Sequence, residues 1–132
     1  MKQLFAVAIL CLSYGFTNAQ YINNSGGYQV GRIVKPAVYD KDNNQIGRIS
    51  DGRAYDRSGN ELGRFDGTYI YKNGDQIGSV DGNILYDASR NQLARFDGDN
   101  VLLDRGGYTV FRIQGLNRSD VIMFFYFFKP KN

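Results

Sequence analysis

The residues with the most chemistry in this sequence are arginines and tyrosines that recur at a nearly constant spacing. The arginine column comprises Arg32, Arg48, Arg64, Arg95 and Arg112, and tyrosines such as Tyr55 and Tyr71 recur in the runs between them. A guanidinium binds carboxylates through paired N–H donors, and arginine and tyrosine are both common at binding surfaces. The candidate ligand-binding residues are therefore Arg32, Arg48, Arg64 and Arg95, with Tyr55 and Tyr71.

A local interpretation competes with this ligand site. Each arginine could instead pair with an aspartate of an adjacent turn, or lie over the face of a tyrosine ring. The sequence favours the local interpretation. Two departures also break the regularity of the columns, because Ser79 stands where other copies have arginine, and Leu103 stands where others have tyrosine.

The composition argues against most catalytic chemistry. There is no histidine, and the one cysteine is Cys11, so Ser–His and Cys–His nucleophiles and the usual zinc sites are not expected. Paired carboxylates could still hydrolyse a glycoside. However, the regular aspartates occupy Asp-Gly turns, where a turn explains them fully. The loop from Asp40 to Gln45 lacks the glycine and the distal glutamate of a calcium loop. No catalytic residue, cofactor or metal is predicted.

Short apolar runs position the arginines and tyrosines. Six runs of the type Ile-Gly-Arg-Ile recur about every 16 residues, and five runs of the type Val-Tyr-Asp alternate with them. The first set is 30–33, 46–49, 62–65, 77–80, 93–96 and 110–113, and the second is 38–40, 54–56, 70–71, 85–87 and 102–104. Each run is short, rich in Ile, Val, Phe and Tyr, and bounded by turn residues, which indicates β-strands.

Two kinds of turn alternate between these runs. One is Asp-Gly, as at Asp51-Gly52, which suits a tight hairpin because both central residues can adopt positive φ. The other is a longer polar loop such as 56–61, whose Asp and Asn can bond their own backbone. Lys35-Pro36 replaces Asp-Gly in the first unit.

These signals predict an all-β fold, a closed meander of about five two-stranded hairpins with pseudo-fivefold symmetry. A two-stranded unit cannot bury a face alone, and closure removes exposed sheet edges. The predicted organisation is a signal peptide at 1–19, a lead-in at 20–29, the repeat domain at 30–113 and an apolar C-terminal segment at 114–132. The sixth Ile-Gly-Arg-Ile-like run, 110–113, would close the first unit or replace it.

The 16-residue unit with its Ile-Gly-Arg-Ile, Asp-Gly and Tyr-Asp-x-x-Gly-Asn elements resembles the five-fold β-flower protein family. The resemblance covers roughly Val30 to Ile113 and extends to the apolar C-terminus. It implies the closed repeat fold and an exported bacterial setting, and it implies no catalytic residue.

Strand alternation predicts which columns face the core. The residue before each tyrosine is apolar, and we assign this column to the core: Val38, Ala54, Ile70, Leu85 and Leu102. The glycine column, as at Gly47, is expected to let a neighbouring tyrosine ring or backbone approach closely. The tyrosine rings would cover the strand face with their hydroxyls near water.

The tail from Ser119 to Phe128 has eight consecutive apolar residues from Val121, too few to span a membrane as a helix. A short buried helix and a doubly buried strand both fit such a run. We favour a helix that packs across one mouth of the barrel, with Ser119 or Asp120 as its N-cap. An exposed patch for a membrane or a partner is the alternative.

The first nineteen residues have the features of a secretory signal. Lys2 precedes an apolar run, and small residues before Gln20 predict cleavage after Ala19. Lipid modification of Cys11 is disfavoured, because a lipid-modified cysteine normally follows a small residue and Leu10 is not small. The expected location is periplasmic or extracellular. The formal net charge of +3 is mild and evenly spread, which argues against nucleic acid.

The sequence thus predicts an exported, non-enzymatic β-repeat module that binds or interacts. The partner classes it suits are a glycan, an anionic small molecule or an envelope protein, with no transmembrane span. The alternatives are a purely structural or inhibitory envelope protein and, less favoured, a glycoside-active enzyme.

Overall fold

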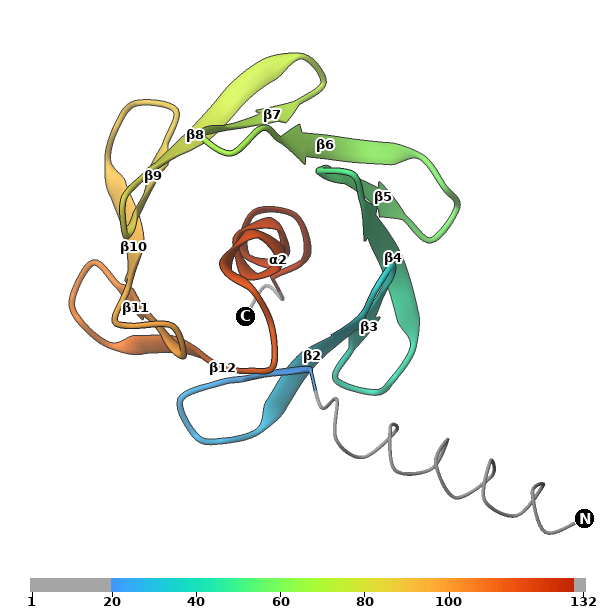
Figure 1. Ribbon diagram of the computed structural model, residues 1–132, viewed down its shortest axis with the longest axis horizontal. Helices are drawn as coiled ribbons and strands as arrows, with labels where there is room; N and C mark the ends of the chain where they lie inside the picture. The colour runs from blue at the N-terminus through green and yellow to red at the C-terminus, as the bar shows by residue number, and fades with distance from the viewer. Residues whose placement is uncertain (1–19, 130–132) are drawn as a thin grey trace, which may run out of the picture.

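The computed structural model describes residues 20–129. The predicted signal peptide, its cleavage site and Cys11 involve residues outside this range. Within it, twelve strands form one closed antiparallel barrel, in which each strand pairs with its neighbours in the chain and β1 pairs with β12 (Figure 1). The strands are β1 (Tyr21–Asn23), β2 (Gln29–Val34), β3 (Ala37–Asp40), β4 (Gln45–Ser50), β5 (Arg53–Asp56), β6 (Glu61–Phe65), β7 (Tyr69–Lys72), β8 (Asp75–Asp81), β9 (Ile84–Asp87), β10 (Gln92–Phe96), β11 (Val101–Asp104) and β12 (Thr109–Gln114). The predicted closed meander is confirmed.

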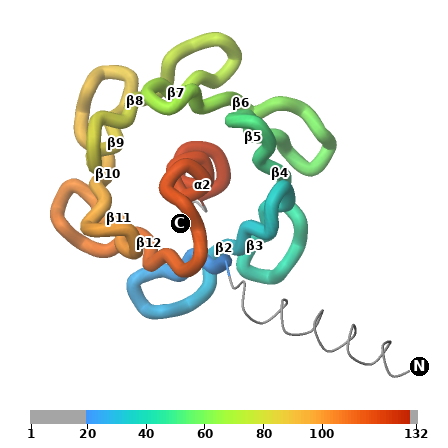
Figure 2. The backbone as a smooth tube through the Cα atoms, in the orientation of Figure 1, coloured from blue at the N-terminus to red at the C-terminus, as the bar shows by residue number. Residues whose placement is uncertain are grey.

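The twelve strands of residues 20–129 make six hairpins, one more than the sequence suggested. The additional strand is β1, which lies in the segment expected to be a lead-in. Ile22 is fully buried and pairs with Ile113 of β12, so β1 supplies the sixth copy of the Val-Tyr-Asp-like run. The tube in Figure 2 shows the hairpin loops splayed outward around the ring. We call each hairpin with its loop a petal.

Alternation along the strands separates an inner face from an outer face. The predicted core column is buried in every copy, because Val38, Ala54, Ile70, Leu85 and Leu102 each have 0% exposure. The glycine column also faces inward, and in β10 and β12 it holds buried Ala94 and Phe111 instead of glycine. The barrel interior is therefore narrow at Phe111 and open at four glycines.

The C-terminal segment fills this interior. It forms an α-helix, α2 (Arg118–Met123), followed by a π-helical turn, η1 (Phe124–Phe128), and it lies at the centre of the ring (Figure 1). A helix was predicted, but its expected position across one mouth is wrong. Its residues are buried among the strands instead, since Val121, Ile122, Met123 and Phe124 have at most 3% exposure.

The aromatic rings of η1 occupy the space left by the glycines. A Cβ on Gly31 would be 2.6 Å from Phe124 Cε2, and one on Gly47 would be 2.6 Å from Phe128 Cε1. The remaining pairs are Gly63 with Phe127, at 2.5 Å, and Gly78 with Tyr126, at 2.7 Å. The prediction of a close approach is confirmed, but the approaching rings belong to the C-terminal helix rather than to strand tyrosines. The strand tyrosines contribute their backbone carbonyls, such as Tyr55 O beside Gly47.

Side chains at the start of the helix cap it and connect it to the barrel. Asn117, not Ser119 or Asp120, is the N-cap, and its Oδ1 accepts a hydrogen bond from Asp120 N at 2.9 Å. The buried carboxylate of Asp120 lies 3.2 Å from the ammonium of Lys35, in the turn between β2 and β3. Arg118 donates to Asn83 Oδ1 at 2.6 Å and to the Gly98 carbonyl at 3.2 Å. The helix entrance is thus tied to three different turns.

The predicted turn chemistry holds with one refinement. Both central residues adopt positive φ at Asp51-Gly52, with φ of 54° and 76°. At Asp66 the side chain instead accepts from the N–H groups of Thr68 and Tyr69. The hydrogen bonds from Tyr69 N and Thr68 N hold the pKa of this carboxyl below its usual range.

Adding a methyl group to the glycine column should destabilise the barrel. In a Gly63→Ala variant the new Cβ would overlap the Tyr71 carbonyl and stand 2.5 Å from Phe127 Cε1. We expect a loss of about 1–3 kcal/mol in the free energy of unfolding, measured by urea denaturation. Ser58→Ala, at an exposed loop position, is the control and should be nearly neutral. Equal stability of Gly63→Ala and the parent would contradict this packing.

Candidate functional site

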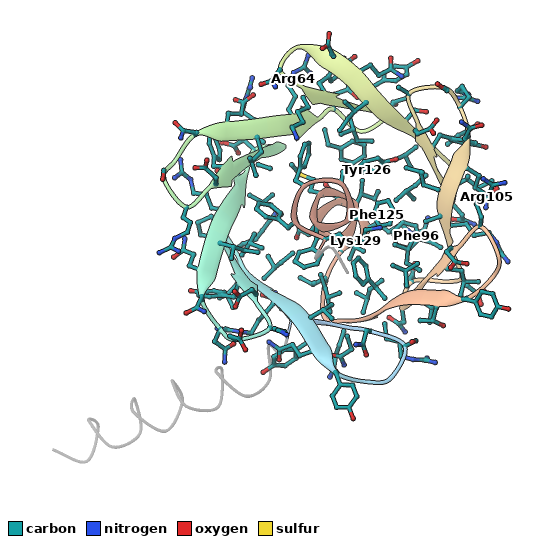
Figure 3. The ribbon with its side chains drawn as sticks, turned by 180° about the vertical axis from the view of Figure 1, so that it is seen from behind. Arg64, Phe96, Arg105, Phe125, Tyr126 and Lys129 are labelled. Carbon is teal, nitrogen blue, oxygen red and sulfur yellow. The ribbon has the colours of Figure 1, made fainter. Side chains whose placement is uncertain are left out.

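The strand geometry places the predicted arginines and tyrosines on the outer wall. In β2, β4 and β6 the glycine and the apolar residue after the arginine face inward, so the arginine between them faces outward. Antiparallel register then sets Arg32 opposite Tyr39, Arg48 opposite Tyr55 and Arg64 opposite Tyr71. Figure 3 shows Arg64 at the periphery, whereas Phe125 and Tyr126 lie toward the axis.

Each of these three arginines lies over the ring of its paired tyrosine. The guanidinium carbon is 4.2 Å from the ring centroid for Arg32 and Tyr39, 4.3 Å for Arg48 and Tyr55, and 4.0 Å for Arg64 and Tyr71. These are cation–π distances, worth about 0.5–1 kcal/mol each at exposed sites. Stacking was one form of the local interpretation, and the structure contains it at three junctions between neighbouring petals.

A fourth stack is formed by a residue that the sequence reasoning missed. Tyr86 lies opposite Ser79, the position where arginine is absent. The guanidinium of Arg90, from the loop between β9 and β10, lies 4.6 Å from the Tyr86 ring centroid, and its Nη1 donates to Ser79 Oγ at 3.5 Å. The sequence carries a signal for this stack, because the strand arginine is replaced by Ser79 and the following loop contains an arginine.

The belt defined by these four stacks covers adjacent petals and then stops. It comprises the pairs Arg32–Tyr39, Arg48–Tyr55, Arg64–Tyr71 and Arg90–Tyr86. Arg95 lies opposite Leu103, and Arg112 lies opposite Asn23, so these two predicted positions have no tyrosine across the strand. The structure therefore groups the candidate residues Arg32, Arg48, Arg64, Tyr55 and Tyr71, and it sets Arg95 apart from them.

The belt arginines keep their positive charges available for a ligand. Within residues 20–129, none of the four belt arginines forms an ion pair, and the pairs present involve Lys35, Arg53 and Arg118. A guanidinium that stacks on a ring keeps its N–H donors at the rim available for an oxygen ligand. The stacking also restricts the arginine rotamers, which reduces the entropy lost when a ligand binds.

Carboxylates do not assemble into a metal centre in the part of the chain that the structure describes. No group of three His, Cys, Asp or Glu side chains there could hold a metal ion. The Asp-Gly aspartates are distributed around the ring in separate turns, as expected for residues that shape hairpins.

Among residues 20–129, Tyr126 has the one buried hydroxyl whose pKa is strongly raised. Its hydroxyl donates to the Tyr86 carbonyl at 2.6 Å. Burial, with a smaller contribution from the charge of Asp87, raises the pKa of Tyr126 well above its usual range. This phenol is a neutral donor that anchors η1 to the strand wall.

The fold and the belt define a class: a closed β-hairpin repeat module whose lumen is filled by its own C-terminal helix. A family profile described as 5-fold beta-flower protein matches residues 19–129. The chain belongs to this family, as the repeat predicted. It is not a known enzyme family, and its members are repeat modules of unestablished function.

No curated protein and no solved structure shows significant similarity to the chain. Among the described residues, no helix has both the length and the hydropathy needed to cross a membrane.

Moving the fourth arginine back to the strand should recover the stack. Ser79→Arg alone would bring a second guanidinium to Tyr86 beside Arg90, and should destabilise the protein by about 1 kcal/mol or more. Adding Arg90→Gly removes that repulsion and places glycine at a φ of 68°. We expect the double variant to be at least 1 kcal/mol more stable than the sum of the single changes predicts, measured as a double-mutant cycle in urea. If the stability effects of the two single changes simply add, the two arginines do not compete for the same position over the Tyr86 ring.

The Tyr126 hydroxyl should make stability depend on alkaline pH. Since folding raises its pKa, its stabilising contribution is complete below pH 10, the ordinary pKa of tyrosine, and is lost as the pH rises above 10. At pH 7 Tyr126→Phe should be about 1 kcal/mol less stable than the parent, because the hydrogen bond to Tyr86 is lost. Urea unfolding from pH 7 to 11 should show this gap narrowing above pH 10. A constant gap would mean that Tyr126 ionises freely in the folded protein.

Proposed function

We propose that this protein is an exported, non-enzymatic binding module that uses the belt to hold an anionic ligand of the cell envelope. The observation that carries the proposal is the division of the barrel. The interior is occupied by the helix, whereas the outer wall carries four neighbouring guanidiniums stacked on tyrosines. The side chains able to bind a ligand therefore lie on the outside of the ring.

The belt suits a ligand that repeats its charge. Petals with equivalent backbones present equivalent guanidiniums, so a polymer or a flat molecule with several carboxylates or phosphates could contact more than one at a time. Each contact would be weak alone, and their combination would supply affinity through effective concentration. Candidate ligands are an acidic glycan, an anionic small molecule or the acidic face of an envelope protein.

Export is part of the proposal and is supported by the sequence. The features of residues 1–19 are those of a secretory signal, and the remaining chain has no cysteine, so its stability does not depend on a redox compartment. N-terminal mass analysis of the protein recovered outside the cytoplasm should find Gln20 as the first residue. Both the periplasm and the extracellular space agree with the proposal.

Replacing the central belt arginines should remove binding and leave the fold intact. We expect Arg48→Gln and Arg64→Gln each to weaken the binding of an acidic oligosaccharide such as a hexagalacturonate about tenfold or more, measured by titration calorimetry. The melting temperature should change little, since each stack is worth about 0.5–1 kcal/mol.

Arg57→Gln is the matched control, because it removes the same charge from an exposed loop outside the belt. If the belt variants bind every anionic ligand of a screen as tightly as the parent, the belt is a structural feature and a purely structural envelope role is favoured.

A further inference from the structure

Five of the six hairpin loops share one construction. The first residue of each loop is Asp or Asn, and its Oδ1 accepts hydrogen bonds from the backbone N–H groups of the third and fifth residues. These loops are 24–28, 40–44, 56–60, 87–91 and 104–108, and the fourth residue of each has positive φ. Because all five are held by the same bonds, differences in their side chains stand out.

Two of these loops carry a different pair of residues. The fifth position is asparagine in three loops, but it is Tyr28 in loop 24–28 and Tyr108 in loop 104–108. Both tyrosines are 75% exposed. In the same two loops the third position is glycine, and a Cβ there would stand 3.3 Å from Tyr28 Cδ2 at Gly26 and 3.2 Å from Tyr108 Cδ2 at Gly106. The glycines let the rings lie against the loop backbone.

The same two petals lack the strand tyrosine of the belt. The strand before loop 24–28 has Asn23 in that column, and the strand before loop 104–108 has Leu103. In these petals the aromatic ring has moved from the strand wall to the loop. The two petals are neighbours, because β1 pairs with β12 across the closure of the barrel, and their loops project outward from adjacent positions on the ring in Figure 1.

We propose that loops 24–28 and 104–108 form a glycan-binding surface, with Tyr28 and Tyr108 as platforms for pyranose rings of one sugar chain. This surface is separate from the belt and goes beyond the function proposed above. The tyrosine rings would contact the apolar C–H faces of the sugars. Ser25 and Arg105, which are exposed in the same loops, would donate hydrogen bonds to sugar hydroxyls. Figure 3 shows Arg105 at the outer edge of its petal.

The surroundings of the two rings favour a sugar over a protein partner. Apart from the tyrosines, the two loops contain only glycine, serine, asparagine, aspartate and arginine. A stable protein interface needs about 800 Å² from each partner with an apolar core, which isolated rings in a polar rim do not supply. A pyranose instead has a small apolar face and a polar edge. A tyrosine ring has few rotatable bonds, and the bonded loops hold it in place, so little entropy is lost on binding.

The test measures retention of the purified protein on chitohexaose and cellohexaose, which carry no charge for the belt to bind. We expect at least one of these glycans to bind the parent. Tyr28→Ala and Tyr108→Ala should each weaken that binding tenfold or more, and the double variant should abolish it. Tyr28→Phe should retain binding, because the ring rather than the hydroxyl forms the platform. Asn44→Ala changes the same position in a loop without tyrosine and should leave binding unchanged.

Three outcomes would overturn the proposal. The parent binds no glycan of the set, or the alanine variants bind glycans as tightly as the parent does. In the third, the alanine variants lose an envelope protein that the parent retains in pull-downs, while their glycan binding is unaffected. The last would reassign the surface to a protein partner. Arg48→Gln and Arg64→Gln should leave Tyr-dependent glycan binding intact, so failure of this surface and failure of the belt are distinguishable.

Discussion

The structure depends on one constraint, the insertion of five consecutive aromatic residues into a ring of strands with little room for side chains. Phe124, Tyr126, Phe127 and Phe128 each meet a glycine on a different petal, and Phe125 contacts Phe111 with ring centroids 6.4 Å apart. Phe111 also contacts Phe124, at 5.6 Å. A helix fits inside this β-barrel because four strands expose glycine backbone to the interior, and the aromatic rings of the helix pack against it.

The π-helical turn follows from this arrangement. An α-helix has 3.6 residues per turn, whereas i→i+5 bonding widens the turn so that it holds more residues. In η1 successive residues meet successive petals: going from the petal of Gly47 to that of Gly78, the contacting rings run from Phe128 back to Tyr126. Each of the four glycine petals thus receives one ring from the helix. The petal of β12 provides its own ring, Phe111, which packs against Phe124 and Phe125.

Filling the lumen moves the chemistry to the outer wall. The belt follows the strand tyrosines of β3, β5, β7 and β9, whereas the exposed loop tyrosines lie on the two petals that lack a strand tyrosine. Arg90 shows that the belt is maintained where its usual residue is missing, since a loop arginine reaches the position that Ser79 leaves open. The same repeat backbone thus supports different surfaces on different petals.

The sequence by itself determined the strands, the turns, the closed meander and the buried column from Val38 to Leu102, because period-two alternation and Asp, Asn and Gly turns are local signals. It also indicated that the glycine column accepts a close neighbour. Only the tertiary structure decided which neighbour that is, that Tyr21–Asn23 completes the ring as a sixth hairpin, that the helix lies inside rather than across a mouth, and that Arg90 joins the belt. These depend on contacts between residues far apart in the chain, such as Gly31 with Phe124, for which local propensity carries no information.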